Sequence, residues 1–130
     1  MIVDTSAIIA IVKREPGWEA LQSLLGSNPV RMSAGTLAEL LIVTGAGISV
    51  EVREATMSIV TNAGTEIVPL TADDAAGAAD AYLRFGKGRH PAKLNMGDTY
   101  AYVLAKRTDE PLLCVGEDFP QTDLSLVPST

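Results

Sequence analysis

Four short apolar segments, separated by longer stretches with helical spacing, constrain the fold of this chain most strongly. The segments are "MIVDTS" at 1–6, "VRMS" at 30–33, "TEIVPLT" at 65–71 and "PLLCVG" at 111–116. Strands so far apart along the chain cannot pair as tight hairpins, whereas parallel strands need long, usually helical crossovers. The pattern therefore predicts the α/β class, with a mainly parallel sheet covered by helices on both faces.

Local signals predict where the intervening helices begin and end. Pro16 and Gly17 end the first helix, and glycines end later ones. Thr71 and Asp74 have capping-box spacing at the start of a helix that runs through Ala75 to Phe85. After "PLLCVG" we expect a turn, "EDFPQTD", and then a last short strand around "LSLVP".

Composition sets the class of protein. A length of 130 residues, 47% hydrophobic and 20% charged, suits one folded domain over residues 1–130 and excludes a disordered chain. Cys114 is the one cysteine, so no internal disulfide can form, and a reducing, cytoplasmic location is expected. Asp4 interrupts the first apolar run, which argues against a signal peptide or a membrane span.

Four acidic residues lie where the predicted strands lead into helices. Asp4 ends the first strand, Asp118 follows the strand "LLCV", Asp98 is in the first turn of a helix, and Glu39 is in the first or second turn of another. Ligands of open parallel sheets bind beyond the carboxyl ends of the strands, so these carboxylates are expected to meet. An ionised Glu39 within "TLAELLIV" needs a partner, and oxygen-only ligands favour Mg²⁺ or Mn²⁺.

Each acid also has a structural alternative. Asp4 can cap the helix that follows it, and Asp118 can shape the "GEDF" turn. Capping-box spacing also occurs twice, at Thr36 with Glu39 and at Asn95 with Asp98. A cation that neutralises several carboxylates explains the four acids together better than four separate caps.

The chemistry that suits such a site is metal-assisted hydrolysis of a phosphodiester bond. Thr5 and Ser6, beside Asp4, can orient a carboxylate or a metal-bound water, or can instead cap the first helix.

A basic arm precedes Asp98 in a chain of formal net charge -6. Its members are Lys87, Arg89, His90 and Lys93. We expect the arm to bind the backbone phosphates of a polyanion beside the acids; the alternative is a solvated loop. His90 is a weak candidate for a general acid, because it precedes Pro91 in a loop with no evident orienting partner.

Four stretches of the chain resemble the PIN-domain ribonucleases, and within them the VapC toxins. They are "MIVDTSAIIAI" with the acid of "AGTLAELLIV", then "RFGKGRHPAKLNMGDTYAYVLAK", then "PLLCVGEDFPQTDL". The resemblance implies a three-layer α/β/α sandwich and a Mg²⁺- or Mn²⁺-dependent endoribonuclease, the toxin of a type II toxin-antitoxin pair. It also implies an acidic centre of Asp4, Glu39, Asp98 and Asp118, although Glu117 or Asp123 can substitute for the last.

The same resemblance implies a homodimer and a VapB-type antitoxin whose C-terminal segment blocks the site, often with a basic side chain. Apolar residues on the first helices offer a surface for a partner helix, unless they form the core. These residues are Ile8, Ile11, Val12, Trp18 and Leu21.

Two other functions compete with this prediction. A haloacid-dehalogenase-like phosphatase needs a second aspartate two residues after Asp4, where this chain has Ser6. A catalytically weak RNA-binding or scaffold module of the same fold would not need the complete set of acids.

Overall fold

A parallel four-stranded sheet forms the centre of the molecule in the computed structural model, which describes residues 1–128. The strands are β1 (Ile2–Val3), β2 (Arg31–Ser33), β3 (Glu66–Val68) and β4 (Leu112–Leu113). Their order in the sheet is β3-β2-β1-β4, and every pair is parallel. The predicted α/β class is confirmed.

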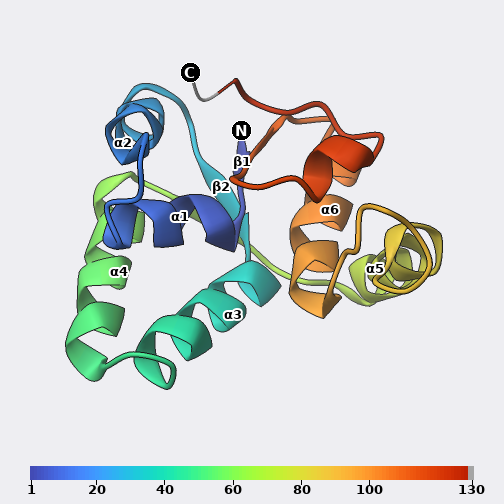
Figure 1. The fold of residues 1–130 in the computed structure, drawn as a ribbon, viewed down its shortest axis with the longest axis horizontal. Coiled ribbons are helices and arrows are strands. Elements are labelled where there is room, and N and C mark those ends of the chain that lie inside the picture. Colours follow the sequence, from blue (N-terminus) through green and yellow to red (C-terminus); the bar gives the residue numbers. More distant parts are fainter. Residues whose placement is uncertain (129–130) are drawn as a thin grey trace.

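Helices connect the strands and cover both faces of the sheet. They are α1 (Thr5–Val12), α2 (Trp18–Ser27), α3 (Ala34–Gly45), α4 (Val50–Asn62), α5 (Ala72–Phe85) and α6 (Met96–Thr108). Figure 1 shows β1 and β2 between α1, α2 and α4 on one side and α6 with α5 on the other. α3 packs against both α4 and α6, and it thereby closes one end of the sandwich.

The alternation of side chains along the two-residue strands divides the core in two. Ile2 and Leu112 belong to the hydrophobic cluster under α5 and α6, while Val3 and Leu113 belong to the cluster under α1, α2 and α4. All four side chains are completely buried. Successive residues of a strand point to opposite faces, so strands this short still contribute to both layers.

Side-chain caps fix where several helices begin. The predicted capping box of Thr71 and Asp74 is present at α5, with hydrogen bonds of 3.1 Å in both directions. The N-cap of α3 is Ser33, whose hydroxyl accepts from the Gly35 amide. The capping-box interpretation of Thr36 with Glu39 is therefore wrong, because α3 starts three residues earlier than that interpretation requires.

The C-terminal segment differs from the sequence prediction. The strand expected around residues 124–128 is absent, and Leu126 makes only an isolated bridge to Leu112. Before it, residues Phe119–Gln121 form a single 3₁₀ turn. The returning chain bonds β4 at Leu112, whose amide donates to the Ser125 carbonyl at 3.0 Å and whose carbonyl accepts from the Val127 amide at 2.9 Å.

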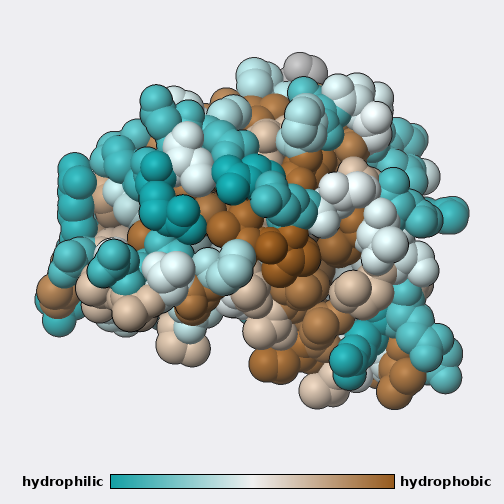
Figure 2. All heavy atoms as spheres, turned by 180° about the vertical axis from the view of Figure 1, so that it is seen from behind, coloured by the Kyte–Doolittle hydropathy of each residue, from teal (hydrophilic) through white to brown (hydrophobic). Residues whose placement is uncertain are grey.

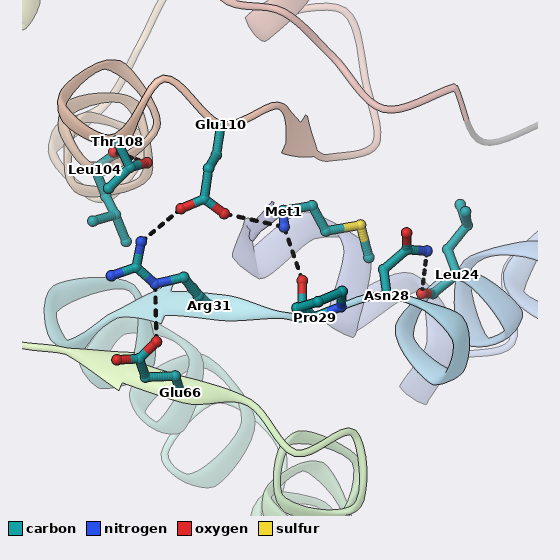
Figure 3. Close-up of polar contacts among 9 residues, drawn as sticks. All are labelled: Met1, Leu24, Asn28, Pro29, Arg31, Glu66, Leu104, Thr108 and Glu110. Carbon is teal, nitrogen blue, oxygen red and sulfur yellow. Dashed lines mark hydrogen bonds and ion pairs between the residues drawn. The ribbon is translucent and has the colours of Figure 1, made fainter.

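An ion-pair network ties together the amino ends of the strands (Figure 3). Arg31 at the start of β2 bonds Glu110 at 2.6 Å and Glu66 at 3.0 Å, and Glu110 also pairs with the Met1 ammonium at 3.2 Å. Burial alone would raise the pKa of Glu110, but these positive partners lower it. The network lies at the opposite end of the strands from Asp4 and Asp118.

Within residues 1–128, no helix combines the length and the hydrophobicity that a bilayer crossing requires.

Candidate metal centre

Asp4 directly follows β1 and caps α1. Its Oδ2 accepts a hydrogen bond of 3.0 Å from the Ser6 amide, as the capping alternative predicted. Its other oxygen, Oδ1, is buried and has no hydrogen-bond partner among the described residues. Burial raises the pKa of Asp4, and the charge of Glu39 adds to this effect against the hydrogen bonds from Ser6. Capping therefore leaves one carboxylate oxygen available to a cation.

Glu39 finds its partner 34 residues away in the sequence. The hydroxyl of Thr5 donates to Glu39 Oε1 at 2.8 Å. On its other side the carboxylate lies against Gly97, where a Cβ atom would overlap Glu39 Oε2. α3 and the first turn of α6 thus approach so closely that any side chain at position 97 would displace the Glu39 carboxylate.

Asp98 is the common neighbour of the other three acids. It forms the predicted capping box of α6, with its Oδ2 accepting from the Asn95 amide at 3.0 Å. Burial is the main reason why its pKa rises from 3.8 to about 7, against the hydrogen bond from Asn95. The negative charges of three carboxylates raise it further, and these are Asp4, Glu39 and Asp118.

Asp118 lies on the surface at the start of the 3₁₀ turn, and its side chain makes no capping hydrogen bond. Its charge acts on Asp98, which places it at the same end of the sheet. Asp123, one of the two alternatives to it, is bound by Tyr102 at 2.6 Å and by Lys106 at 3.1 Å. A carboxylate held in this way is poorly suited to replace Asp118 as a ligand.

A hard divalent cation fits these donors, although the carboxylates do not form a closed cage. Over residues 1–128, no three or more His, Cys, Asp or Glu side chains are grouped so that they could hold a metal ion. Mg²⁺ commonly binds one or two carboxylates together with water and substrate phosphates. Such a cation would give the unpartnered Asp4 oxygen a partner, and its positive charge would lower the raised pKa of Asp98.

Cys114 lies close to the same acids and is half-buried. Burial raises the pKa of its thiol to about 12, and the charges of Asp4 and Asp98 contribute to the rise. Without a bound cation the thiol therefore stays protonated at neutral pH.

Comparison with known proteins identifies the family. The PIN domain family matches residues 1–124. Ribonuclease VapC42 of Mycobacterium tuberculosis is 44% identical over 126 residues, which cover 95% of this chain and 96% of that protein. The chain belongs to the VapC family of PIN-domain ribonucleases. Ribonuclease VapC of Mycolicibacterium smegmatis is 40% identical over 128 residues, 98% of this chain and 99% of that protein.

Solved structures of VapC toxins share the fold. M. tuberculosis VapC20, described as a toxin that cleaves the sarcin-ricin loop, has a TM-score of 0.78 at 18% identity and covers 97% of both chains. VapBC2 of Rickettsia felis, solved with a DNA fragment from its promoter, has a TM-score of 0.72 at 16% identity and covers 97% of this chain and 96% of that one. The predicted PIN-like α/β/α sandwich is confirmed.

The basic arm is a hydrogen-bonded loop whose positive side chains face solvent. Gly86 and Leu94 pair at its base, and Lys87, Arg89 and Lys93 are exposed. His90 faces inward: its Nδ1 accepts from the Ala92 amide at 3.0 Å, and its ring packs edge-on against Phe85. These contacts suit a structural role for His90.

The apolar residues of the first helices in this VapC protein belong to the core, which was the alternative to a partner surface. Ile8, Ile11 and Leu21 are core residues, each at most 4% exposed. Two adjoining cavities of about 650 and 420 Å³ instead form an apolar groove over α3, α5 and α6, with Leu70, Met96 and Tyr100 lining both. The smaller cavity reaches Glu39 and Gly97. Figure 2 shows hydrophobic surface gathered in the middle and lower part of the back face.

Gly97 is the residue of the site that sequence reasoning missed. The sequence did contain a signal. In "NMGDTY" a glycine lies in the first turn of the predicted helix, where most other residues would stabilise the helix more.

Proposed function

We propose that this protein is the toxin of a type II toxin-antitoxin pair and that it hydrolyses RNA with a divalent cation bound near Asp98. The cation is Mg²⁺, with Mn²⁺ as a substitute, and Asp4, Glu39, Asp98 and Asp118 bind it, some directly and the others through its water ligands. The main support for this proposal is that the acids act on one another: the charges of the other three raise the pKa of Asp98, and one buried oxygen of Asp4 has no hydrogen-bond partner among the described residues.

Hydrogen bonds within the chain prepare the carboxylates for this role. The Ser6 amide fixes Asp4, the Thr5 hydroxyl fixes Glu39, and the Asn95 amide fixes Asp98. A bound divalent cation supplies a water of lowered pKa and neutralises charge on the phosphate. Partners that hold ligands in place reduce the reorganisation needed when the cation and the RNA bind.

RNA cleavage by the purified protein tests the proposal. We expect cleavage in Mg²⁺ or Mn²⁺, none in EDTA, and recovery when the cation is restored in excess. Asp4→Asn, purified in parallel, keeps an oxygen for the Ser6 amide but loses the charge, so it should remain inactive in either cation. Cleavage that persists in EDTA, or in Asp4→Asn, contradicts the metal mechanism. RNA binding without cleavage would favour the catalytically weak module.

The basic arm is proposed to hold RNA through its exposed Lys87, Arg89 and Lys93. Lys87→Ala should weaken binding of single-stranded RNA and lower the slope of log affinity against log salt by roughly 0.7 for each phosphate that the arm no longer neutralises. Binding titrations between low and moderate salt measure this slope. Lys13→Ala, at the exposed end of α1, is the control and should leave it unchanged. If the slope is unchanged for Lys87→Ala, the solvated-loop alternative holds for the arm.

A VapB-type antitoxin is the proposed protein partner. R. felis VapBC2 and the toxin-antitoxin complex from Klebsiella pneumoniae, which has a TM-score of 0.71, support such a partner by their descriptions. Glu39 lines the apolar groove, so an amphipathic segment lying in it can bring a basic side chain to the acids. A homodimer and a cytoplasmic location stay predictions from the resemblance and from the single cysteine.

A further inference from the structure

The side chain of Asp118 makes no capping hydrogen bond, so the turn that carries it matters for its position. The turn that begins at this residue is closed by several hydrogen bonds. The Gln121 amide donates to the Asp118 carbonyl at 3.1 Å, and the Thr122 amide and hydroxyl donate to the Phe119 carbonyl at 2.9 and 2.7 Å. The Leu124 amide then donates to the Thr122 hydroxyl at 3.3 Å. Residues 118–124 therefore form one connected unit.

Asp123 attaches this unit to α5 and α6. Its Oδ1 accepts from the Tyr102 hydroxyl at 2.6 Å, and its Oδ2 lies 3.1 Å from Lys106 Nζ and 3.5 Å from Arg84 Nη1. Burial raises the pKa of Tyr102, and the hydrogen bond to Asp123 raises it further, so the phenol stays a donor. Burial would raise the pKa of Asp123, but the bonds from Tyr102 and Lys106 lower it, so the carboxylate stays ionised.

Two further contacts complete the attachment of the segment. Phe119 is buried in the core beneath α5 and α6. Upstream, the Val115 amide donates to the Ser6 hydroxyl at 2.9 Å, while the Ser6 amide holds Asp4 Oδ2. The segment that carries Asp118 is thus tied on one side to the residue that fixes Asp4, and on the other to Tyr102 on the helix that carries Asp98.

We propose that Asp123 is a positioning residue: bound by Tyr102 and Lys106, it holds the 118–124 unit so that Asp118 faces Asp98. This inference rests on the proposed function, since it concerns how one proposed ligand reaches the cation. It also gives Asp123 a role other than that of a substitute ligand, because both of its oxygens are already bound within the fold.

Tyr102→Phe and Asp123→Ala test the inference. Tyr102→Phe removes the hydroxyl and keeps the ring, which packs against Phe85. We expect kcat for RNA cleavage to fall about 10-fold, the KM for RNA to stay unchanged, and the Mn²⁺ concentration for half-maximal rate to rise. Asp123→Ala should change the same quantities in the same direction and by more.

Arg107→Gln is the matched control. Arg107 joins α6 to Asp74 of α5 by hydrogen bonds of 2.8 and 3.2 Å, so its replacement weakens the same helix pair without touching the 118–124 unit. We expect Arg107→Gln to lower Tm about as much as Tyr102→Phe does. The kcat and the Mn²⁺ concentration for half-maximal rate should stay unchanged. If Arg107→Gln lowers kcat as much as Tyr102→Phe, the effect is general destabilisation and the inference is wrong.

A double-mutant cycle shows whether Tyr102 acts through Asp118. In the Asp118→Asn background, Tyr102→Phe should produce no further loss of kcat, because the ligand that it positions is already gone. If the fold-losses of kcat in the two single variants multiply in the double variant, the inference is wrong.

Hydrogen exchange separates this inference from the proposed function. Tyr102→Phe should speed amide exchange in residues 118–124, and Arg107→Gln should not. This measurement needs no cleavage. If the protein cuts no RNA but its variants show this exchange pattern, the attachment is supported and the proposed function is wrong. Unchanged exchange in Tyr102→Phe overturns the attachment, whatever the activity.

Discussion

Replacing Gly97 by alanine should reduce RNA cleavage at least about 100-fold while the protein remains folded. A Cβ at this position would overlap the Glu39 carboxylate, so the carboxylate must move. Since it is the far end of a flexible side chain, it can do so at small cost in stability, but it then leaves its hydrogen bond with Thr5. The variant should therefore separate activity from stability.

Steady-state cleavage and thermal unfolding of the same preparations measure this separation. Gly26→Ala is the control, because a Cβ at this helical glycine meets nothing within 4 Å. It should keep full activity and gain up to about 1 kcal/mol of stability from helix propensity. In a Glu39→Ala background, Gly97→Ala should cause no further loss. Full activity of Gly97→Ala itself would show that the Glu39 position does not matter for cleavage.

Asp98→Asn should have two opposite effects, a loss of cleavage and a gain of stability. Cleavage should fall about 1000-fold or more, because a central metal ligand loses its charge. In EDTA at pH 8 the free energy of unfolding should rise by roughly 1 to 2 kcal/mol. The asparagine retains an oxygen that can accept from the Asn95 amide, so the cap of α6 is preserved.

The gain depends on pH in a direction that follows from the raised pKa of Asp98. The folded protein holds this proton up to about pH 7, while the unfolded chain releases it near 3.8. Stability contributed by the protonated carboxyl is therefore complete below pH 4, declines between pH 4 and 7, and is lost above pH 7. The stabilisation is smaller than the full pKa difference implies, because water reaches part of the side chain and screens its charge.

Thermal unfolding between pH 4 and 8 checks this prediction. The advantage of Asp98→Asn over the wild type should vanish near pH 4, where both side chains are neutral. Asp80→Asn, on the exposed face of α5, should show no such trend. Excess Mg²⁺ should stabilise the wild type more than Asp98→Asn, since ligand binding to the folded state adds to its stability. A variant that is less stable than the wild type in EDTA at pH 8 contradicts the proposed strain among the acids.

Local chemistry made much of the fold predictable. The capping boxes of α5 and α6 and the alternating apolar segments depend on neighbours within a few residues, and the structure has them where the sequence placed them. The last strand was predicted wrongly: the returning chain forms an isolated bridge between Leu126 and Leu112 in place of a strand. The spacing of Ile8 and Ile11 fits a core helix and a partner-binding helix equally well, so only the structure decided that these residues form the core.

The sequence by itself determined the parallel α/β class and the four acids near strand ends, because both follow from short-range periodicity and from the direction of parallel strands. Only the tertiary structure decided which oxygen of Asp4 stays unpartnered, that Thr5 holds Glu39, that Gly97 makes room for it, and that Asp123 is bound elsewhere. The physical reason is that these features depend on burial or join residues that lie far apart in the sequence, and hydrogen bonds and desolvation of that kind exist only once the helices have packed.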